Sequence, residues 1–365
     1  MAARPAWGQV SSPGASAVEA AEPQALVVSH WFDSGDEGEP YTATIRLHGR
    51  RVGADGAPVR GQTFVHEESV QGVVPGTGRV SLTSWVYGIA KGEWIVNAEL
   101  AAPARRSGGQ LGAERGRRES AVTSAAWSWR HWRLTDGSSG PVATRWALLA
   151  PLARSPGVLP GAFTALAVVG IILAIVTQAV ILGGRGLPVA SGVVASIVAL
   201  SGGLIGAKLW YMAIKGQPWR QAIGQGWSVD GFIVLAPLVA VVTSLGMGVP
   251  TGAYLDAAAP GIFLAVAIGR VGCFVTGCCA GRCTASRWSV WSSDRRVGAR
   301  RIPTQLLESG VGLVLAIVTG VAIMNPVPGA DGMVFVASMV LYGVARQGLL
   351  RLRAETRRFS WRRAG

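Results

Sequence analysis

The two halves of the chain differ in their pattern of hydrophobic and polar positions. Within residues 24–103, short runs alternate apolar and polar side chains and are separated by Gly, Asp and Pro. Such alternation is typical of strands that bury one face, and runs at roughly ten-residue spacing predict a small antiparallel, all-β sandwich-like domain. The five runs are ALVVSHWF, YTATIRLHG, TFVHEESVQGVV, VSLTSWVYGI and EWIVNAEL.

The segments around these runs have other textures. Residues 1–23 are rich in Pro, Ala and Ser and lack the apolar stretch of a secretory signal, so we expect a disordered N-terminus. The Arg- and Gly-rich residues 104–124 predict a flexible linker or insert. Residues 125–154 predict a terminal strand and a connector, in which Trp127, Trp129 and Trp132 pack in the sandwich or mark a membrane interface. This half contains no recognisable active site, which indicates attachment or recognition.

Long uncharged stretches characterise the second half. A helix needs about 20 apolar residues to cross about 30 Å of hydrocarbon, and residues 155–184 contain no charged side chain. We therefore predict a multi-pass α-helical membrane protein with about six or seven transmembrane helices in residues 155–351, followed by a basic tail at 352–365. The predicted spans are 163–182, 186–207, 231–255, 257 to just beyond Arg270, 303–324 and 332–345.

Composition and charge support this division. Only 15% of the 365 residues are charged, 50% are hydrophobic and the mean hydropathy is +0.36, which excludes a disordered chain and a wholly soluble enzyme. Residues 1–150 carry a net charge of +1 and residues 151–365 a net charge of +13. Because the excess lies in the apolar half, it indicates a membrane rather than a nucleic-acid partner. Basic residues cluster at 282–301 and in the tail, and this predicts that both termini face the cytoplasm.

Candidate chemistry begins at the end of the fourth predicted span, with the sequence GRVGCFVTGCCAGR at 269–282. An arginine near hydrocarbon costs on the order of 2.5–3.5 kcal/mol on insertion scales, so Arg270 requires an explanation. It either snorkels to the interface or serves a function. Four glycines, at 269, 272, 277 and 281, remove side-chain bulk around it and allow a helix or a lipid headgroup to approach closely. A guanidinium in such a niche suits a phosphate.

The last predicted span offers a second cation. Tyr342 and Arg346 are four residues apart and therefore lie on one helix face. Two intramembrane arginines can bracket a phospholipid phosphate and stabilise it as a leaving group. The alternative is that Arg346 simply begins the basic tail.

Five blocks within residues 160–350 carry a family resemblance, in the family's order. They are GAKLWY at 206–211, DAAAP at 256–260, GRVGCFVTGCCAGR at 269–282, RIPTQLLE at 301–308 and YGVAR at 342–346. Together they resemble the prolipoprotein diacylglyceryl transferases, integral membrane enzymes that move diacylglycerol from phosphatidylglycerol to the lipobox cysteine of a preprolipoprotein. The resemblance implies that Arg270, Arg346 and Tyr342 act on the phospholipid phosphate. It implies a substrate-binding role for Lys208, Tyr211, Gly272, Gly277, Gly281, Arg282, Gln305 and Glu308.

The chain departs from the family pattern at several positions. The family's His-Gly-Gly corresponds here to Asp230-Gly231-Phe232, and all four histidines of the chain lie in the first half. Asp230 is a candidate general base for a thiol, or marks the water-facing start of a helix. Lys208 replaces an arginine, and Cys273 stands where the family often has asparagine. The resemblance also implies action from the outer face of the membrane, opposite to the side that the loop charges predict.

The four cysteines all lie between Cys273 and Cys283. Zinc sites usually combine cysteine pairs with a distant second pair or with histidines, and this second half contains neither. We therefore expect no metal and no cofactor, and we expect the cysteines to pack at a helix interface.

The sequence thus predicts phosphatidylglycerol-dependent transfer of a diacylglyceryl group to a preprolipoprotein cysteine thiol, with release of glycerol phosphate, in the bacterial plasma (inner) membrane. The expected partners are phosphatidylglycerol, a preprolipoprotein and the lipid bilayer, with no nucleic acid. The alternative is a catalytically altered family member that binds lipid or acts as a scaffold, with the sandwich docking a cytoplasmic partner.

Overall fold

The computed structural model describes residues 23–53, 55–101, 122–216, 226–325 and 329–354. The segments predicted as a disordered terminus and a linker therefore lie almost entirely outside the described residues. The chain divides into two compact units, which we call the β unit and the helical unit. The β unit comprises residues 1–162, 273–305 and 352–365, and the helical unit comprises 163–272 and 306–351.

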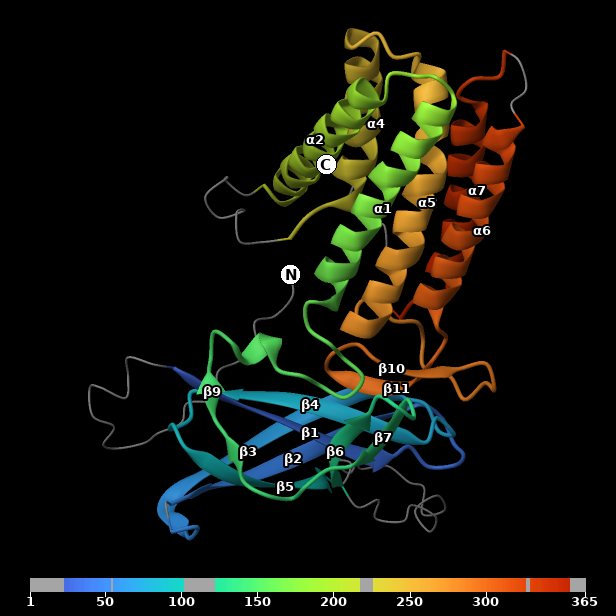
Figure 1. The fold of residues 1–365 in the computed structure, drawn as a ribbon. Coiled ribbons are helices and arrows are strands. Elements are labelled where there is room, and N and C mark those ends of the chain that lie inside the picture. The colour runs from blue at the N-terminus through green and yellow to red at the C-terminus, as the bar shows by residue number, and fades with distance from the viewer. Residues whose placement is uncertain (1–22, 54, 102–121, 217–225, 326–328, 355–365) are drawn as a thin grey trace, which may run out of the picture. The chain divides into compact units, whose positions relative to one another are not determined.

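Two antiparallel sheets form the β unit (Figure 1). The larger sheet has seven strands in the order β10-β11-β4-β1-β6-β7, with β9 also paired to β1, and the smaller has four in the order β3-β2-β5-β8. The strands are β1 (Gln24–Asp33), β2 (Tyr41–Val52), β3 (Pro58–Val73), β4 (Arg79–Tyr87), β5 (Glu93–Ala101), β6 (Thr123–Ser128), β7 (Arg133–Asp136), β8 (Val142–Ala143), β9 (Arg145–Trp146), β10 (Val290–Ser293) and β11 (Val297–Arg301). The prediction of an N-terminal all-β sandwich-like domain is confirmed.

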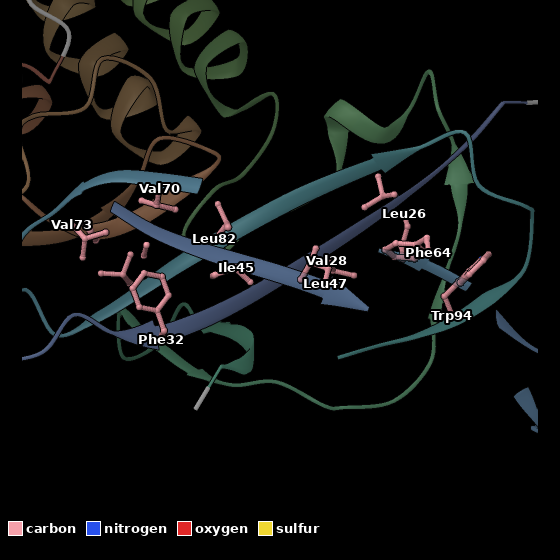
Figure 2. Packing of buried hydrophobic residues seen from close by; sticks show 14 of the residues in the cluster. Leu26, Val28, Phe32, Ile45, Leu47, Phe64, Val70, Val73, Leu82 and Trp94 are labelled. Carbon is pink, nitrogen blue, oxygen red and sulfur yellow. The ribbon is translucent and has the colours of Figure 1, made fainter. Parts of the chain in front are cut away.

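The core of the β unit lies between these sheets. Every second residue of β1 points inward, and Leu26, Val28 and Phe32 are almost completely buried. They pack in one cluster with Ile45 and Leu47 of β2, as Figure 2 shows. The period-two pattern of the sequence is therefore the direct cause of the sandwich, because each strand has one apolar face to bury.

A hairpin from the second half of the chain completes the larger sheet. Strands β10 and β11 lie between the glycine-rich block at 269–282 and the helix that begins at Thr304. They pair with each other, and β11 also pairs with β4 (Figure 1). The backbone N–H of Thr83 donates to the carbonyl of Arg296 (2.8 Å), and the Arg296 guanidinium lies 2.6 Å from the Glu68 carboxylate. The N-terminal strands and this connection therefore fold together and lie on the same side of the membrane.

Tryptophans reinforce the same junction. Trp127 stacks on Trp291 of β10, with ring centroids 4.5 Å apart, and the indole N–H of Trp132 donates to the carbonyl of Trp291 (3.1 Å). Trp132 also stacks on Phe274, near the end of the preceding helix (5.5 Å). These aromatic side chains attach the hairpin to strands β6 and β7, which is a packing role.

Six helices are long and apolar enough to cross a membrane, so the multi-pass prediction is confirmed. They are α1 (Ala162–Gly184), α2 (Val189–Lys215), α4 (Val229–Gly246), α5 (Thr251–Thr276), α6 (Thr304–Met324) and α7 (Met333–Leu350). Two predicted boundaries were wrong. Helix α4 ends at Gly246, and α5 begins at Thr251 and includes Asp256, because Gly248 adopts a left-handed conformation (φ +67°) and Pro250 follows it. Helix α2 continues eight residues beyond the predicted end, to Lys215.

Glycines bring α2 and α4 into close contact. A Cβ atom on Gly206 would lie 2.7 Å from the carbonyl oxygen of Gly231 and 2.6 Å from the Cβ atom of Leu235. A Cβ on Gly231 would in turn lie 2.2 Å from the carbonyl oxygen of Gly206. Both glycines thus permit the backbones to touch, as small residues do in membrane helix pairs.

We expect Gly206→Ala to destabilise the helical unit by about 1–3 kcal/mol, because the added methyl group overpacks this contact. The matched control is Gly320→Ala in α6, where a Cβ would meet nothing within 4 Å. Thermal unfolding of the two variants, followed by far-ultraviolet circular dichroism in nanodiscs, measures the difference. Equal midpoints for the two variants would contradict the close packing.

One buried histidine predicts a pH dependence of the β unit. His30 is 5% exposed, and burial lowers its pKa from 6.5 to about 4, against a weaker opposite effect of a hydrogen bond to the Val96 backbone. The unfolded chain therefore binds a proton between about pH 6.5 and pH 4 that the folded chain does not. The free energy of unfolding therefore shows no loss from His30 above pH 6.5 and decreases as the pH falls toward 4. The total loss from this one group is about 3 kcal/mol at most.

Thermal unfolding of the full chain between neutral pH and pH 4, followed by tryptophan fluorescence, measures this decline. In His30→Phe the same decline is expected to be smaller by the contribution of one histidine. An unchanged pH profile in that variant would show that other groups cause the dependence.

Candidate functional site

A buried carboxylate in α6 gathers the polar side chains of the helical unit. Glu308 is 1% exposed, and its Oε1 atom accepts from Arg270 Nη2 of α5 (2.8 Å) and from the Tyr342 hydroxyl of α7 (2.8 Å). Arg346 Nη1 donates to the same oxygen, and it also lies 3.4 Å from the Tyr342 hydroxyl. We call these four residues the Glu308 cluster.

The cluster lies near one end of three spanning helices. Arg270 is six residues before the end of α5, about 9 Å along the helix axis, and Arg346 is four residues before the end of α7, about 6 Å. Glu308 is four residues after the start of α6. All three charged side chains therefore lie within two turns of the end of their helix.

Apolar packing supports the cluster from below. The ring of Phe263 lies 5.7 Å from the ring of Tyr342, and Phe263 packs with Ala259 and Leu315 in a buried core between α5, α6 and α7. The Ser309 hydroxyl donates to the carbonyl of Ala267 (2.8 Å), which fixes α6 against α5 one residue from Glu308. The four polar side chains therefore lie next to a packed apolar core that holds the three helices together.

The charges of the cluster do not balance. Two guanidinium groups contact one carboxylate, so the four side chains carry two formal positive charges and one formal negative charge. The carboxylate is more buried than either arginine, whose side chains are 16% and 23% exposed. The surplus charge therefore lies on the accessible side of the cluster. Such an arrangement can bind an anion without desolvating a new cation, because the guanidinium groups are already positioned.

The glycine-rich turn after α5 belongs to the β unit and has structural causes of its own. Gly277 adopts φ +73°, the N–H of Cys278 donates to the carbonyl of Cys273, and the N–H of Gly277 donates to that of Phe274. This is a Schellman C-cap, which requires a residue without a Cβ at position 277. A Cβ on Gly281 would lie 2.1 Å from the carbonyl oxygen of Ile302. Both predicted site glycines thus shape the turn.

Gln305 and Arg282 also act on the backbone of this turn. The Gln305 side chain is 1% exposed and donates to the carbonyl of Cys278 (2.9 Å). Arg282 is exposed and donates through Nε to the carbonyl of Arg353 (3.3 Å). Gln305 and Arg282 lie in the β unit, and the members of the Glu308 cluster lie in the helical unit. Gly272 is buried in the last two turns of α5.

None of the four cysteines, all of which lie in the described residues, forms a disulfide bond. Hydrogen bonding to the Cys273 side chain, followed by bonding to Cys279 and by burial, raises the pKa of Cys278 above its usual range. Burial likewise raises the pKa of Cys283. Protonated thiols are poor nucleophiles and poor metal ligands. Within the described residues, no group of three His, Cys, Asp or Glu side chains is arranged to hold a metal ion.

The remaining predicted residues lie on α2 and α4. Lys208 is 5% exposed, and its ammonium lies 4.9 Å from the ring of Trp227 and 5.9 Å from that of Tyr211. Aromatic faces stabilise a desolvated cation, which explains how α2 holds this charge. Asp230 is exposed in the first turn of α4, with the Ser228 hydroxyl 3.5 Å away, and it is not a member of the Glu308 cluster.

Sequence reasoning missed the role of Asp256. Its carboxylate is 3% exposed and accepts from the backbone N–H groups of Gly332 and Phe335, both at 2.8 Å. Asp256 of α5 therefore caps the N-terminus of α7, where free N–H groups attract an anion. An acidic residue within an apolar stretch was the available signal, but no spacing rule connects it to a helix start 76 residues later.

Comparison with known proteins finds a family model that matches the second half of the chain. The family model of the prolipoprotein diacylglyceryl transferases matches residues 161–362, which is more than half of the chain. The chain belongs to this family. The six helices, the Glu308 cluster and the glycine-rich turn all lie within the matched residues, whereas the strands β1–β9 precede them.

Individual relatives are distant. The chain is 34% identical over 123 residues to a phosphatidylglycerol–prolipoprotein diacylglyceryl transferase of Dehalococcoides mccartyi, which covers 31% of this chain and 47% of the relative. It is 27% identical over 171 residues to one of Clostridium tetani (44% and 68%) and 35% identical over 143 residues to one of Streptomyces coelicolor (34% and 42%). The chain thus aligns with only about half of the first of these relatives.

Proposed function

We propose that this protein transfers a diacylglyceryl group from phosphatidylglycerol to the lipobox cysteine of a preprolipoprotein, in the bacterial plasma membrane. The observation that carries the proposal is the Glu308 cluster, a preformed cationic group in three spanning helices of a chain that belongs to the transferase family. Arg270 and Arg346 lie about 9 Å and about 6 Å along the axis from the nearer ends of their helices, so both are close to one end of a spanning helix.

In the proposed reaction, Arg270 and Arg346 hold the phosphate oxygens of phosphatidylglycerol. The acceptor thiolate attacks the glyceryl carbon of the diacylglyceryl group, a C–S bond forms, and the C–O bond to the phosphate breaks. The electron pair of that bond leaves with glycerol phosphate, whose additional negative charge the two guanidinium groups stabilise. Glu308 orients both arginines, and the Tyr342 hydroxyl, which donates to Glu308, fixes the carboxylate.

The thiol proton requires a base, and Asp230 remains our candidate. The four histidines, His30, His48, His66 and His131, all precede α1, so no histidine of the helices can take this role. Asp230 is exposed at the start of α4, where water and an incoming thiol can both reach a carboxylate. In the helical unit, Lys208, Tyr211 and Gly272 are proposed to contribute to substrate binding. In the β unit, Gln305 and Arg282 are proposed to do so, with Gly277 and Gly281 shaping the turn that carries them.

The absence of a histidine from the helices also supports a second function. A family member that lost the base but kept the Glu308 cluster would still bind a lipid phosphate, with the sandwich docking a partner in the cytoplasm. This alternative requires the β unit inside the cell, whereas the transferase function places it outside. Because β11 pairs with β4, the β unit and the loop of the glycine-rich block share one side in either case.

Complementation distinguishes the two functions. A strain depleted of its own diacylglyceryl transferase should grow with this chain, and a reporter preprolipoprotein should show the lipid-dependent mobility shift. A membrane-impermeant thiol reagent, applied to intact cells that carry Val65→Cys in a Cys279→Ser background, should then label the exposed β3 position. Failure of a well-expressed, membrane-inserted chain to shift the reporter, together with protection of position 65, would contradict the transferase function and favour the alternative.

A further inference from the structure

An exposed apolar surface lies on the β unit, in the segment that connects β9 to α1. Trp146, Leu148, Leu149 and Leu152 are all between 46% and 69% exposed. The surrounding residues are ordered by the 3-10 helix η3 (Ala150–Leu152) and by consecutive turns from Trp146 to Ala153. We call residues 146–152 the connector surface.

The local structure explains why these leucines face outward. Side chains three residues apart share a face in a 3-10 helix. Ala150 and Ala153 are buried against the sheet, and Leu149 and Leu152 therefore project from the opposite face. The indole N–H of Trp85 in β4 donates to the carbonyl of Ala150 (3.1 Å), which holds η3 on the larger sheet. Figure 1 shows the green segment between β9 and α1 next to β4.

The β unit itself contains the ends of two spanning helices. Its residues include Ala162, where α1 begins, and Cys273 to Thr276, the last turn of α5. The N–H of Leu159 donates to the carbonyl of Val275 in that turn (2.9 Å). Leu159 follows Leu152 by seven positions, at most about 25 Å of extended chain. The connector surface is therefore tethered to the membrane boundary at a short distance.

Charge and shape complete the pattern. Arg145 and Arg154 flank the leucines and are exposed. Beside Leu152 lies a cleft of about 100 Å³ whose walls include Trp85, Ser155 and Arg295. The Nε of Arg295 donates to the carbonyl of Thr276 (3.0 Å), which fixes this cation next to the end of α5. Leucines with an aromatic residue and flanking arginines are typical of segments that lie in the membrane interface.

We infer that the connector surface lies in the bilayer interface, with its leucines among the acyl chains and Arg145, Arg154 and Arg295 at the level of anionic phospholipid headgroups. The β unit is thereby held against the membrane independently of the two helix ends. This inference concerns the lipid contact of the connector and does not depend on catalytic activity.

Site-directed spin labelling in nanodiscs of phosphatidylethanolamine and phosphatidylglycerol tests the inference. Leu148→Cys and Leu152→Cys are labelled one at a time in the full chain, in a Cys279→Ser background that removes the exposed native thiol. The matched control is Val65→Cys, since Val65 is 64% exposed in β3 of the smaller sheet and Leu148 is 69% exposed. Power saturation compares the access of oxygen, which concentrates in lipid, with that of a water-soluble nickel chelate.

Labels at positions 148 and 152 should both be accessible to oxygen and protected from nickel, whereas the label at position 65 should show the reverse. If either connector label is as accessible to nickel as the control, the surface lies in water and the inference is overturned. Protection of either label from both reagents would also overturn it, because another part of the chain or a second copy then covers the leucines.

Discussion

Replacing Arg270 by Gln should lower the rate of diacylglyceryl transfer by about 10²–10³-fold, the usual cost of removing one group that stabilises developing negative charge. Arg270 is the guanidinium on α5 that reaches the Glu308 carboxylate, and its side chain is 16% exposed, so it can also contact a ligand. Glutamine keeps hydrogen-bonding capacity but removes the charge that the leaving phosphate requires. The transfer rate of Arg270→Lys should lie between those of the wild type and Arg270→Gln, since lysine retains the charge without the bidentate geometry.

The measurement is transfer from phosphatidylglycerol to a lipobox peptide in nanodiscs, with each variant compared at equal amounts of inserted protein. Arg185→Gln is the matched control, because Arg185 follows α1 and donates to the carbonyl of Ile323 at the far end of α6. We expect the control to keep the wild-type rate. An Arg270→Gln variant with undiminished transfer would remove Arg270 from the mechanism and with it the proposed phosphate site.

The sequence predicted the six spanning helices and the first five strands, but not the β10–β11 hairpin or the contacts between distant elements. Uncharged stretches predicted the helices, because hydrocarbon excludes charge whatever the tertiary packing. The boundary between α4 and α5 was misplaced, since a glycine and a proline interrupted an otherwise continuous apolar stretch at 248–250. Local turn geometry decided that boundary, and hydropathy does not report turn geometry.

Contacts between distant segments could not be predicted in the same way. Glu308 was assigned a substrate-binding role through the family resemblance, but its position as the common acceptor of Arg270, Arg346 and Tyr342 depends on how three helices pack. The pairing of β11 with β4 joins residues more than 200 positions apart, and short polar strands such as VGARR carry no signal for a particular partner. Both features follow from tertiary structure rather than from any local pattern.

Replacing Glu308 by Gln should destabilise the helical unit by about 3 kcal/mol, because loss of one partner leaves buried charge uncompensated. Two guanidinium groups then face each other without the carboxylate that now separates their charges. The loss should be smaller in bilayers that contain phosphatidylglycerol than in neutral phosphatidylcholine. A lipid phosphate that enters the site replaces the missing anion, and a ligand that binds only the folded state stabilises it.

Hydrogen exchange of peptides from α6, in nanodiscs of the two compositions, measures this local stability. Glu67→Gln is the matched control, since the Arg46–Glu67 pair has a similar distance of 2.6 Å but both side chains are more than 40% exposed. Such surface pairs contribute about 0–1 kcal/mol, so the control should change exchange little in either bilayer. Equal destabilisation of Glu308→Gln in both lipids would show that Glu308 is only structural. A loss that phosphatidylglycerol reverses would instead locate the phosphate between the two arginines, as the proposed transfer requires.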